Sequence, residues 1–210
     1  MNIKEPKTRS AIITLPDWTW KNKYKEMLNN NSTSFPNLVT ERLTLRQLEV
    51  TDEQEIFTLR SDSEINKYLG RKPANTMEDA RNFINGILEH SKTNDSFYWA
   101  ITLTGNQKLV GTICLYGFSE ENNNCEIGYE LLTDYQGQGI MTEALEKVVD
   151  YAFNTIGVQK IEAYFHKDNQ RSTQLLENLS FKNSYQQDDK TPELLCYYLT
   201  NENIANSYAQ

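Results

Sequence analysis

The stretch Gln136-Gly137-Gln138-Gly139-Ile140-Met141-Thr142 decides the fold of this chain. Before it, residues 125–132 (CEIGYELL) alternate in the manner of a half-buried strand. After it, apolar residues recur at helical spacing and form one stripe, made of Ala144, Leu145, Val148, Val149, Ala152, Phe153 and Ile156. A glycine-rich turn from a strand into a helix leaves the first helical N–H groups unpaired. Together with the helix dipole, these donors suit a phosphate or pyrophosphate.

The spacing of the glycines argues against the two best-known nucleotide-binding loops. The sequence lacks Gly-x-x-x-x-Gly-Lys-Ser/Thr, and its glycines do not complete the three-glycine dinucleotide fingerprint. Two glycines separated by one residue also occur in plain strand-to-helix turns, so the loop alone leaves that reading open. We expect an anion other than a nucleoside triphosphate or NAD.

Composition indicates an ordinary globular protein of 210 residues. A net charge of −8 argues against a general nucleic-acid or anionic-membrane surface. It would favour a cationic acceptor such as an amine or a basic protein, although solubility explains it better. Cys114, Cys125 and Cys196 are odd in number and, like the two histidines, lack metal-like spacing, so we expect no metal site. The N-terminus has no apolar core segment, which predicts a cytoplasmic protein without a signal peptide or transmembrane span.

The chain divides into three parts. Residues 1–36 form an extension and linker, residues 37–200 the main domain, and residues 201–210 a C-terminal tail. The extension carries apolar residues, among them Trp18 and Tyr24, that are suited to docking on the domain or on a second subunit. A homodimer is therefore one expectation.

The pattern along the main domain predicts an α/β (α+β) fold with one mixed, mostly antiparallel sheet of about seven strands. A capping box of Thr51 and Gln54 is expected to open the first helix of this domain. The expected strands are 43–48, 97–104, 109–118, 125–132, 160–166, 182–187 and 194–199, and further helices are expected to begin near residues 76, 140 and 168. Because a helix crosses between the strands 125–132 and 160–166, these two must be parallel.

The order of elements and four motifs resemble the GNAT superfamily of N-acetyltransferases. Residues 136–141 are similar to the pyrophosphate loop Gln/Arg-x-x-Gly-x-Gly/Ala, with Met141 in the last small position. Residues 126–129 (EIGY), 142–144 (TEA) and 169–172 (NQRS) with Phe181 resemble the branch that contains ribosomal-protein-alanine N-acetyltransferases. The resemblance runs from about residue 38 to residue 199.

The resemblance implies an enzyme that binds acetyl-CoA where its fourth and fifth strands splay apart, with helices on both faces of the sheet. It implies that backbone groups near Leu131, Leu132 and Thr133 pair with the pantetheine. It implies that Gln136 and Gly137 belong to the cofactor-binding loop. The pyrophosphate would be bound by the backbone N–H groups that follow, those of Gln138, Gly139, Ile140, Met141 and Thr142. The side chain of Met141 must then point away from the phosphates.

Transfer to an amine needs one group that accepts a proton and another that protonates the departing thiolate. We expect Glu126 as the base, then Glu162, then His166, although either glutamate could simply pair with a cation at the sheet surface. Many relatives protonate the thiolate with a tyrosine at the position held here by Leu176, so this role is expected to pass to Ser172. Ser172 could instead cap the helix. Asn169 is expected to hold the pantetheine or thiol end and also to act as an N-cap.

Resemblance to the branch implies a protein or peptide N-terminal α-amine as the acceptor. A small amine such as a polyamine or aminoglycoside is the nearest alternative, and several carboxylates in the cleft would favour it. A non-catalytic acyl-CoA-binding module is conceivable because the tyrosine is missing. A structural, partner-binding protein would have to work mainly through the apolar extension.

Overall fold

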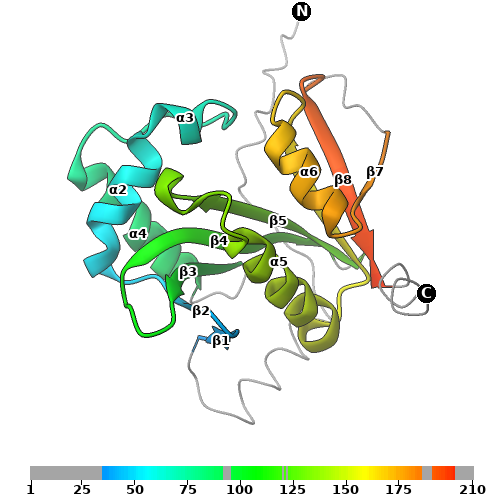
Figure 1. Cartoon of the computed structure of the whole chain (residues 1–210), viewed down its shortest axis with the longest axis horizontal. Coiled ribbons are helices and arrows are strands. Elements are labelled where there is room, and N and C mark those ends of the chain that lie inside the picture. The colour runs from blue at the N-terminus through cyan, green and yellow to red at the C-terminus, as the bar shows by residue number, and fades with distance from the viewer. Residues whose placement is uncertain (1–34, 92–95, 120, 122, 186–190, 202–210) are drawn as a thin grey trace, which may run out of the picture.

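The computed structural model describes residues 35–91, 96–119, 121, 123–185 and 191–201. Within this part of the chain, one mixed sheet has the strand order β1-β2-β3-β4-β5-β6-β8-β7 (Figure 1). The strands are β1 (Leu38–Val39), β2 (Leu43–Gln47), β3 (Phe97–Leu103), β4 (Leu109–Ser119), β5 (Asn124–Leu131), β6 (Lys160–His166), β7 (Lys182–Asn183) and β8 (Leu194–Thr200). The predicted strands are present, and β1 adds a two-residue edge strand that the sequence did not predict.

The strands β5 and β6 are parallel and the other neighbouring strands are antiparallel, as predicted. The ladder between β5 and β6 contains only three residue pairs, ending at Glu126 and Glu162. Both strands continue beyond this rung, β5 to Leu131 and β6 to His166. The two strands therefore separate towards their C-terminal ends, which confirms the expected splayed pair.

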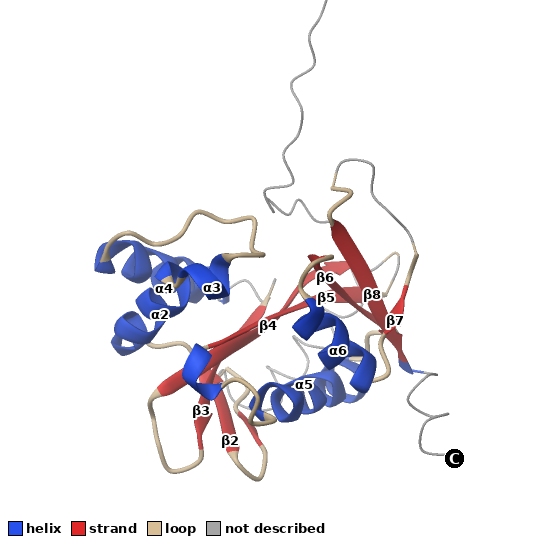
Figure 2. Ribbon diagram, turned by 45° about the horizontal axis from the view of Figure 1, so that its top comes forward, coloured by secondary structure: helices blue, strands red, loops and turns tan. Residues whose placement is uncertain are grey.

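Helices cover both faces of the sheet, and each face has its own apolar core. On one face lie α5 (Ile140–Asp150), its π-helical continuation (Tyr151–Ile156) and α6 (Gln170–Asn178). On the other face α2 (Glu53–Ser61) and α4 (Met77–Ser91) pack together against β3 and β4, joined through the short α3 (Ser63–Asn66). Figure 2 shows α2, α3 and α4 on one side of β4, and α5 and α6 on the other.

Side chains alternate between the two cores along each central strand. On β3, Phe97, Trp99 and Ile101 join the α5 core, whereas Ala100 joins the α2 and α4 core. This alternation is the period-2 pattern that a sheet covered on both faces requires.

Three local features differ from the sequence predictions. The capping box is formed by Glu49 and Asp52 around a 3-10 turn (Val50–Asp52), and not by Thr51 and Gln54, because this turn comes before α2. The long helix ends at Gly157 as expected, with φ of +90°, but its last six residues are π-helical. The strand predicted at residues 182–187 is only two residues long, and residues 186–187 lie outside the described part.

At the start of the described chain, Phe35 and Pro36 contact the core. The ring of Phe35 packs edge-on against Trp99 at 5.7 Å, and the indole N–H of Trp99 donates to the Pro36 carbonyl at 2.8 Å. The rest of the expected extension, including Trp18 and Tyr24, and the tail from residue 202 lie outside the described residues. No helix in the described part is long and apolar enough to cross a membrane.

Candidate active site

The glycine loop joins β5 to α5 beside the separated strands. A 3-10 turn (Thr133–Tyr135) comes first, and then Gly137 and Gly139 adopt φ values of +73° and +74°. A residue with a Cβ in this left-handed region costs about 1–2 kcal/mol, which explains the use of glycine at both positions. Gly139 is the N-cap of α5, and no side chain caps the helix there. We call the space between β5 beyond Glu126 and β6 beyond Glu162 the gap. The loop thus presents the positive end of α5 next to the gap.

The side chain of Met141 points away from this loop, as its expected role requires. It is 7% exposed and belongs to the α5 core, like that of Ile140. A long side chain at the last small position of the motif is therefore compatible with a backbone that faces a ligand. Gln138 and Thr142 are less buried and border the same turn.

Two arginines contact the loop. Arg42 donates to the Gln138 carbonyl at 3.1 Å and to the Glu143 carboxylate at 2.6 Å, and its side chain is half exposed. Arg171, in the first turn of α6, donates to the Gln136 side chain. The positive charge of Arg171 adds to the helix dipole at a place suited to an anion, whereas the charge of Arg42 is compensated by Glu143.

The ladder between β5 and β4 shows which residues of β5 point their backbone N–H and C=O groups at the gap. Leu132 donates its N–H to Val110, and the register pairs Thr112 with Glu130. Because hydrogen-bonded pairs alternate in an antiparallel ladder, even-numbered residues of β5 point their N–H and C=O groups at β4, and odd-numbered ones point them at the gap. Tyr129 and Leu131 therefore offer backbone groups to the gap.

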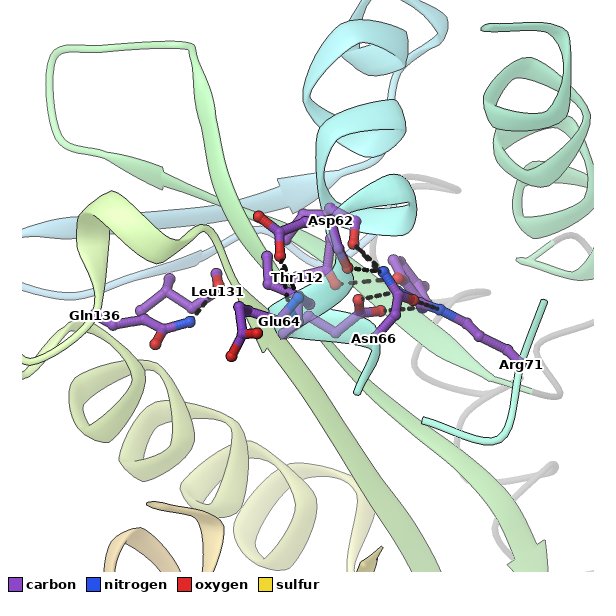
Figure 3. Close-up of polar contacts among 11 residues, drawn as sticks. Asp62, Glu64, Asn66, Arg71, Thr112, Leu131 and Gln136 are labelled. Carbon is purple, nitrogen blue, oxygen red and sulfur yellow. Dashed lines mark hydrogen bonds and ion pairs between the residues drawn. The ribbon is translucent and has the colours of Figure 1, made fainter. Parts of the chain in front are cut away.

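The three residues expected to pair with the pantetheine differ in what their backbone contacts. Leu132 donates to Val110 and accepts from Tyr135, and the carbonyl of Thr133 accepts from Gln136. The carbonyl of Leu131 accepts from the Gln136 side chain at 3.0 Å (Figure 3). The backbone groups of Tyr129 and Leu131 are therefore better placed to form hydrogen bonds with a pantetheine in the gap than those of Leu132 and Thr133.

Glu126 and Glu162 form the last rung between β5 and β6, so their side chains lie on the same face. Glu162 is ion-paired with Lys160 at 2.8 Å and accepts from the Asn124 amide at 2.8 Å. Its surroundings are those of a carboxylate held at the sheet surface by a cation. Glu126 instead accepts a hydrogen bond from the hydroxyl of Tyr116. Burial, together with the charge of Glu126, raises the pKa of Tyr116 and keeps that hydroxyl protonated.

His166 lies at the end of β6, beyond the last rung that β6 shares with β5. Its ring stacks on Tyr68 at 5.5 Å between centroids, and its Nδ1 accepts from the backbone N–H of Asp168 at 3.2 Å. Tyr68 follows α3, so the segment between α3 and α4 reaches across to β6.

A partly buried ion pair holds this segment against β5. Arg71 donates to both carboxylate oxygens of Glu130, at 2.7 and 2.5 Å, and the two side chains are 20% and 13% exposed. Arg71 also donates to Asn66 at 2.7 Å, and Asp62 caps α3 through the N–H groups of residues 64 and 65 (Figure 3). The fork of Arg71 thus joins α3 to the strand that borders the gap.

The first turn of α6 presents Ser172 and Asn169 beside the gap. Asn169 is the N-cap of α6 and accepts from the N–H of Ser172 at 3.2 Å. The cap is therefore Asn169, and the Ser172 hydroxyl instead forms a hydrogen bond with the hydroxyl of Tyr129. Leu176 is fully buried in the core and offers no donor.

The sequence did not single out Arg42, Tyr68, Arg71 or Tyr129 as parts of the site. Tyr129 lies in the EIGY motif, which indicated a strand and formed part of the resemblance but assigned no role to this side chain. The two arginines carried no signal, because their partners are distant in the sequence. Among the described residues, no group of three or more His, Cys, Asp and Glu side chains is arranged to hold a metal ion.

Comparison with known proteins places these features in a family. The model of the "Acetyltransferase (GNAT) domain" matches residues 42–182. The N-acetyltransferase p20 of Bacillus licheniformis is 34% identical over 145 residues, which are 69% of this chain and 82% of that protein. A crystal structure of a GNAT-family acetyltransferase from Bacillus anthracis has a TM-score of 0.69 at 24% identity, covering 80% of this chain and 99% of that one.

Two further relatives are named for their acceptors. The ribosomal protein uS5-alanine N-acetyltransferase of Escherichia coli is 29% identical over 104 residues, 49% of this chain and 54% of that protein. The spermidine N(1)-acetyltransferase of Vibrio cholerae is 22% identical over 140 residues, 67% of this chain and 79% of that protein. A structure of similar fold, the microcin C7 self-immunity acetyltransferase, was solved in complex with acetyl-CoA and AMP. Its TM-score is 0.66 at 21% identity, covering 77% of this chain and 93% of that one.

Proposed function

This chain belongs to the GNAT acetyltransferase family, and from that premise we propose that it acetylates the N-terminal α-amine of a protein or peptide. That it is an acetyl-CoA-dependent N-acetyltransferase follows from the family. The choice of acceptor rests on the charges around the gap.

The observation that carries the acetyl-CoA site is the separation of β5 and β6 directly beside the glycine loop. The loop suits the pyrophosphate because two glycines bring the backbone close and α5 begins there. We assign the pyrophosphate to the N–H groups of residues 138–142, flanked by Arg42 and Arg171. The backbone edge at Tyr129 and Leu131 would pair with the pantetheine, with Asn169 and Ser172 near its thiol end.

The charges on the gap favour an acceptor with a single positive charge. Glu126, Glu130 and Glu162 share one face, because the first two are four residues apart on one strand and the third lies opposite Glu126. Arg71 neutralises Glu130 and Lys160 neutralises Glu162. Because two of these three carboxylates are paired with cations, this face offers little net negative charge to a polyamine, which carries several positive charges. The uS5-alanine relative supports the same choice.

An α-amine also makes modest demands on a base. Its pKa of about 8 leaves about a tenth of it neutral at pH 7, whereas a lysine amine with a pKa of about 10.4 is neutral less than about one time in a thousand. We assign the base role to Glu126, whose position on the last rung faces the gap. Its carboxylate would accept the amine proton directly or through water.

Replacing Glu126 tests this role. Glu126→Gln is expected to lower turnover with a peptide acceptor by about 100-fold at pH 7. The loss should shrink towards pH 9, because the α-amine then loses its proton without help. Glu162→Gln, which removes an ion-paired carboxylate from the same rung, is the matched control and should lose much less. A pH profile of turnover left unchanged by Glu126→Gln would show that Glu126 is not the base.

The acceptor itself is tested with one panel of substrates. Peptides with a free N-terminus, the same peptides with a blocked N-terminus and an internal lysine, spermidine and an aminoglycoside are each incubated with acetyl-CoA. Mass spectrometry then locates the acetyl group. We expect acetylation of the free N-termini, and preferential acetylation of spermidine or the aminoglycoside would refute the acceptor assignment.

Binding of acetyl-CoA is tested separately by thermal unfolding. A ligand bound only by the folded state stabilises it by about 2.7 kcal/mol at 100 times its Kd, so acetyl-CoA should raise Tm by several degrees. No rise at millimolar acetyl-CoA, in protein shown to be folded, would contradict the assigned binding site.

A further inference from the structure

The hydroxyl of Tyr129 forms a hydrogen bond with Ser172 across the separated part of the sheet. Tyr129 lies three residues beyond the last rung between β5 and β6, and its side chain packs on the α5 core. Ser172 is buried in the first turn of α6, and Asn169 holds its backbone N–H. The pair therefore links the strand edge at the gap to the helix at its far side.

Chemistry decides the direction of this hydrogen bond. A phenol is a better donor and a poorer acceptor than an aliphatic hydroxyl. Burial raises the pKa of Tyr129 to about 12, although the hydrogen bond with Ser172 acts in the opposite direction, so the phenol keeps its proton near neutral pH. Tyr129 therefore donates to Ser172. The hydroxyl proton of Ser172 must then point at another acceptor.

We propose that Tyr129 is a positioning residue that directs the Ser172 hydroxyl proton at the sulfur of coenzyme A as this sulfur leaves the acetyl group. The inference rests on the family's use of acetyl-CoA, and it is independent of which amine is the acceptor. A donor whose proton is already aimed stabilises the developing charge without reorganising during the reaction. Leu176, in the same helix, offers no alternative donor.

The reaction balances without another reactant. The amine nitrogen forms a bond to the acetyl carbon, the C–S bond breaks, and its electron pair stays on sulfur. The proton released by the amine passes through the base and solvent and ends on sulfur as the thiol. Ser172 stabilises the sulfur anion before that proton arrives, and Tyr129 keeps Ser172 oriented.

The first experiment measures the pKa of the thiol of coenzyme A bound to the full-length protein. The thiolate is followed by ultraviolet absorption against the complex with desulfo-coenzyme A, so that tyrosine absorption cancels. Hydrogen bonding to the anion lowers a thiol pKa, so the bound thiol should titrate below free coenzyme A. Tyr129→Phe should raise the pKa of the bound thiol by about one, and Ser172→Ala should raise it by at least as much.

The second experiment separates orientation from stability. With a peptide acceptor, Tyr129→Phe should lower kcat by about tenfold and leave KM for acetyl-CoA within about twofold. The double variant Tyr129→Phe/Ser172→Ala should be no slower than Ser172→Ala alone, because Tyr129 acts through Ser172.

The matched control is Tyr197→Phe. The Tyr197 hydroxyl also bonds to α6, donating to Glu177 at 3.0 Å, but at the other end of the helix. This variant should leave the pKa of the bound thiol and kcat unchanged, even if its Tm falls as much as that of Tyr129→Phe.

Three results would overturn the inference: an unchanged pKa of the bound thiol in Tyr129→Phe, losses that multiply in the double variant, or a loss seen only in KM. Failure of the acceptor proposal looks different. In that case spermidine or another amine would be acetylated, and the thiol titration would still respond to Tyr129→Phe.

Discussion

Breaking the ion pair between Arg71 and Glu130 should loosen the segment that carries Tyr68 to the gap. The change is Arg71→Met, which keeps much of the side-chain volume and removes the charge and the donors. It leaves the Glu130 carboxylate, 13% exposed, without its cation and also ends the bond to Asn66. Removing one partner of a fully buried pair costs about 3–5 kcal/mol. Because both side chains here are partly exposed, we expect a smaller loss, about 2–3 kcal/mol.

The assay is thermal and urea unfolding of the full-length chain. For a protein of this size, about 2–3 kcal/mol corresponds to a fall in Tm of about 4–12 °C. The double variant Arg71→Met/Glu130→Gln should lose less than the sum of the single variants, since no unpaired charge remains. The matched control is Arg81→Met, because Arg81 pairs with Glu53 in a more exposed position, and its Tm should stay close to that of the unaltered protein.

The same variant has a functional consequence. Tyr68 stacks on His166, which lies four residues beyond Glu162 on β6 and therefore on the same face of the sheet as Glu126 and Glu162. Arg71→Met should therefore lower turnover with the acceptor more than it weakens acetyl-CoA binding. Equal Tm values for Arg71→Met and Arg81→Met would refute the reasoning, since burial would then not decide the contribution of the pair.

Two further predictions concern the glycine loop and the Glu143 carboxylate, which binds Arg42 beside it. Gly137→Ala and Gly139→Ala should each lose about 1–2 kcal/mol of stability because both positions have positive φ, but Gly139→Ala should also weaken acetyl-CoA binding, measured by calorimetry, by about tenfold. Its methyl group would come within 3.3 Å of the Arg42 guanidinium, whereas at Gly137 nothing lies within 4 Å, so equal binding losses would contradict the assigned loop geometry. Burial acts to raise the pKa of Glu143, but hydrogen bonds from Thr40 and Arg42 outweigh it and hold that pKa below its usual value. Glu143→Gln should therefore destabilise the protein above about pH 4.3, and the difference should vanish as pH falls through the depressed pKa; a difference in urea midpoints that persists at pH 2 would exclude this linkage.

Local patterns were sufficient to predict most elements of the fold. The alternation in residues 125–132 and the apolar stripe after residue 140 placed β5 and α5 almost to the residue. The crossover helix required a parallel pair. The two local features that the sequence did not predict correctly, a capping box and an edge strand, also involve residues close together in the chain. Glu49 and Asp52 form the capping box two residues before Thr51 and Gln54, and the two-residue β1 is too short to show a period.

The site was only partly visible in the sequence. The glycine loop could be found because positive φ is a property of single residues, and the Asn169 cap because capping acts over three residues. The partners of the candidate acid and base could not be found. Whether Glu162 is ion-paired depends on Lys160, and what Ser172 contacts depends on Tyr129, which is 43 positions away in the sequence.

The sequence by itself determined the order of the elements, the parallel crossover and the anion-binding turn, since each follows from the geometry of neighbouring residues. Only the tertiary structure decided where β5 and β6 separate, which carboxylates are neutralised, and that Arg71 and Tyr129 border the gap. The physical reason is that ion pairs and hydrogen bonds form wherever the folded chain brings charges together. Arg71 and Glu130, 59 positions apart, meet only once α3 has packed against the sheet.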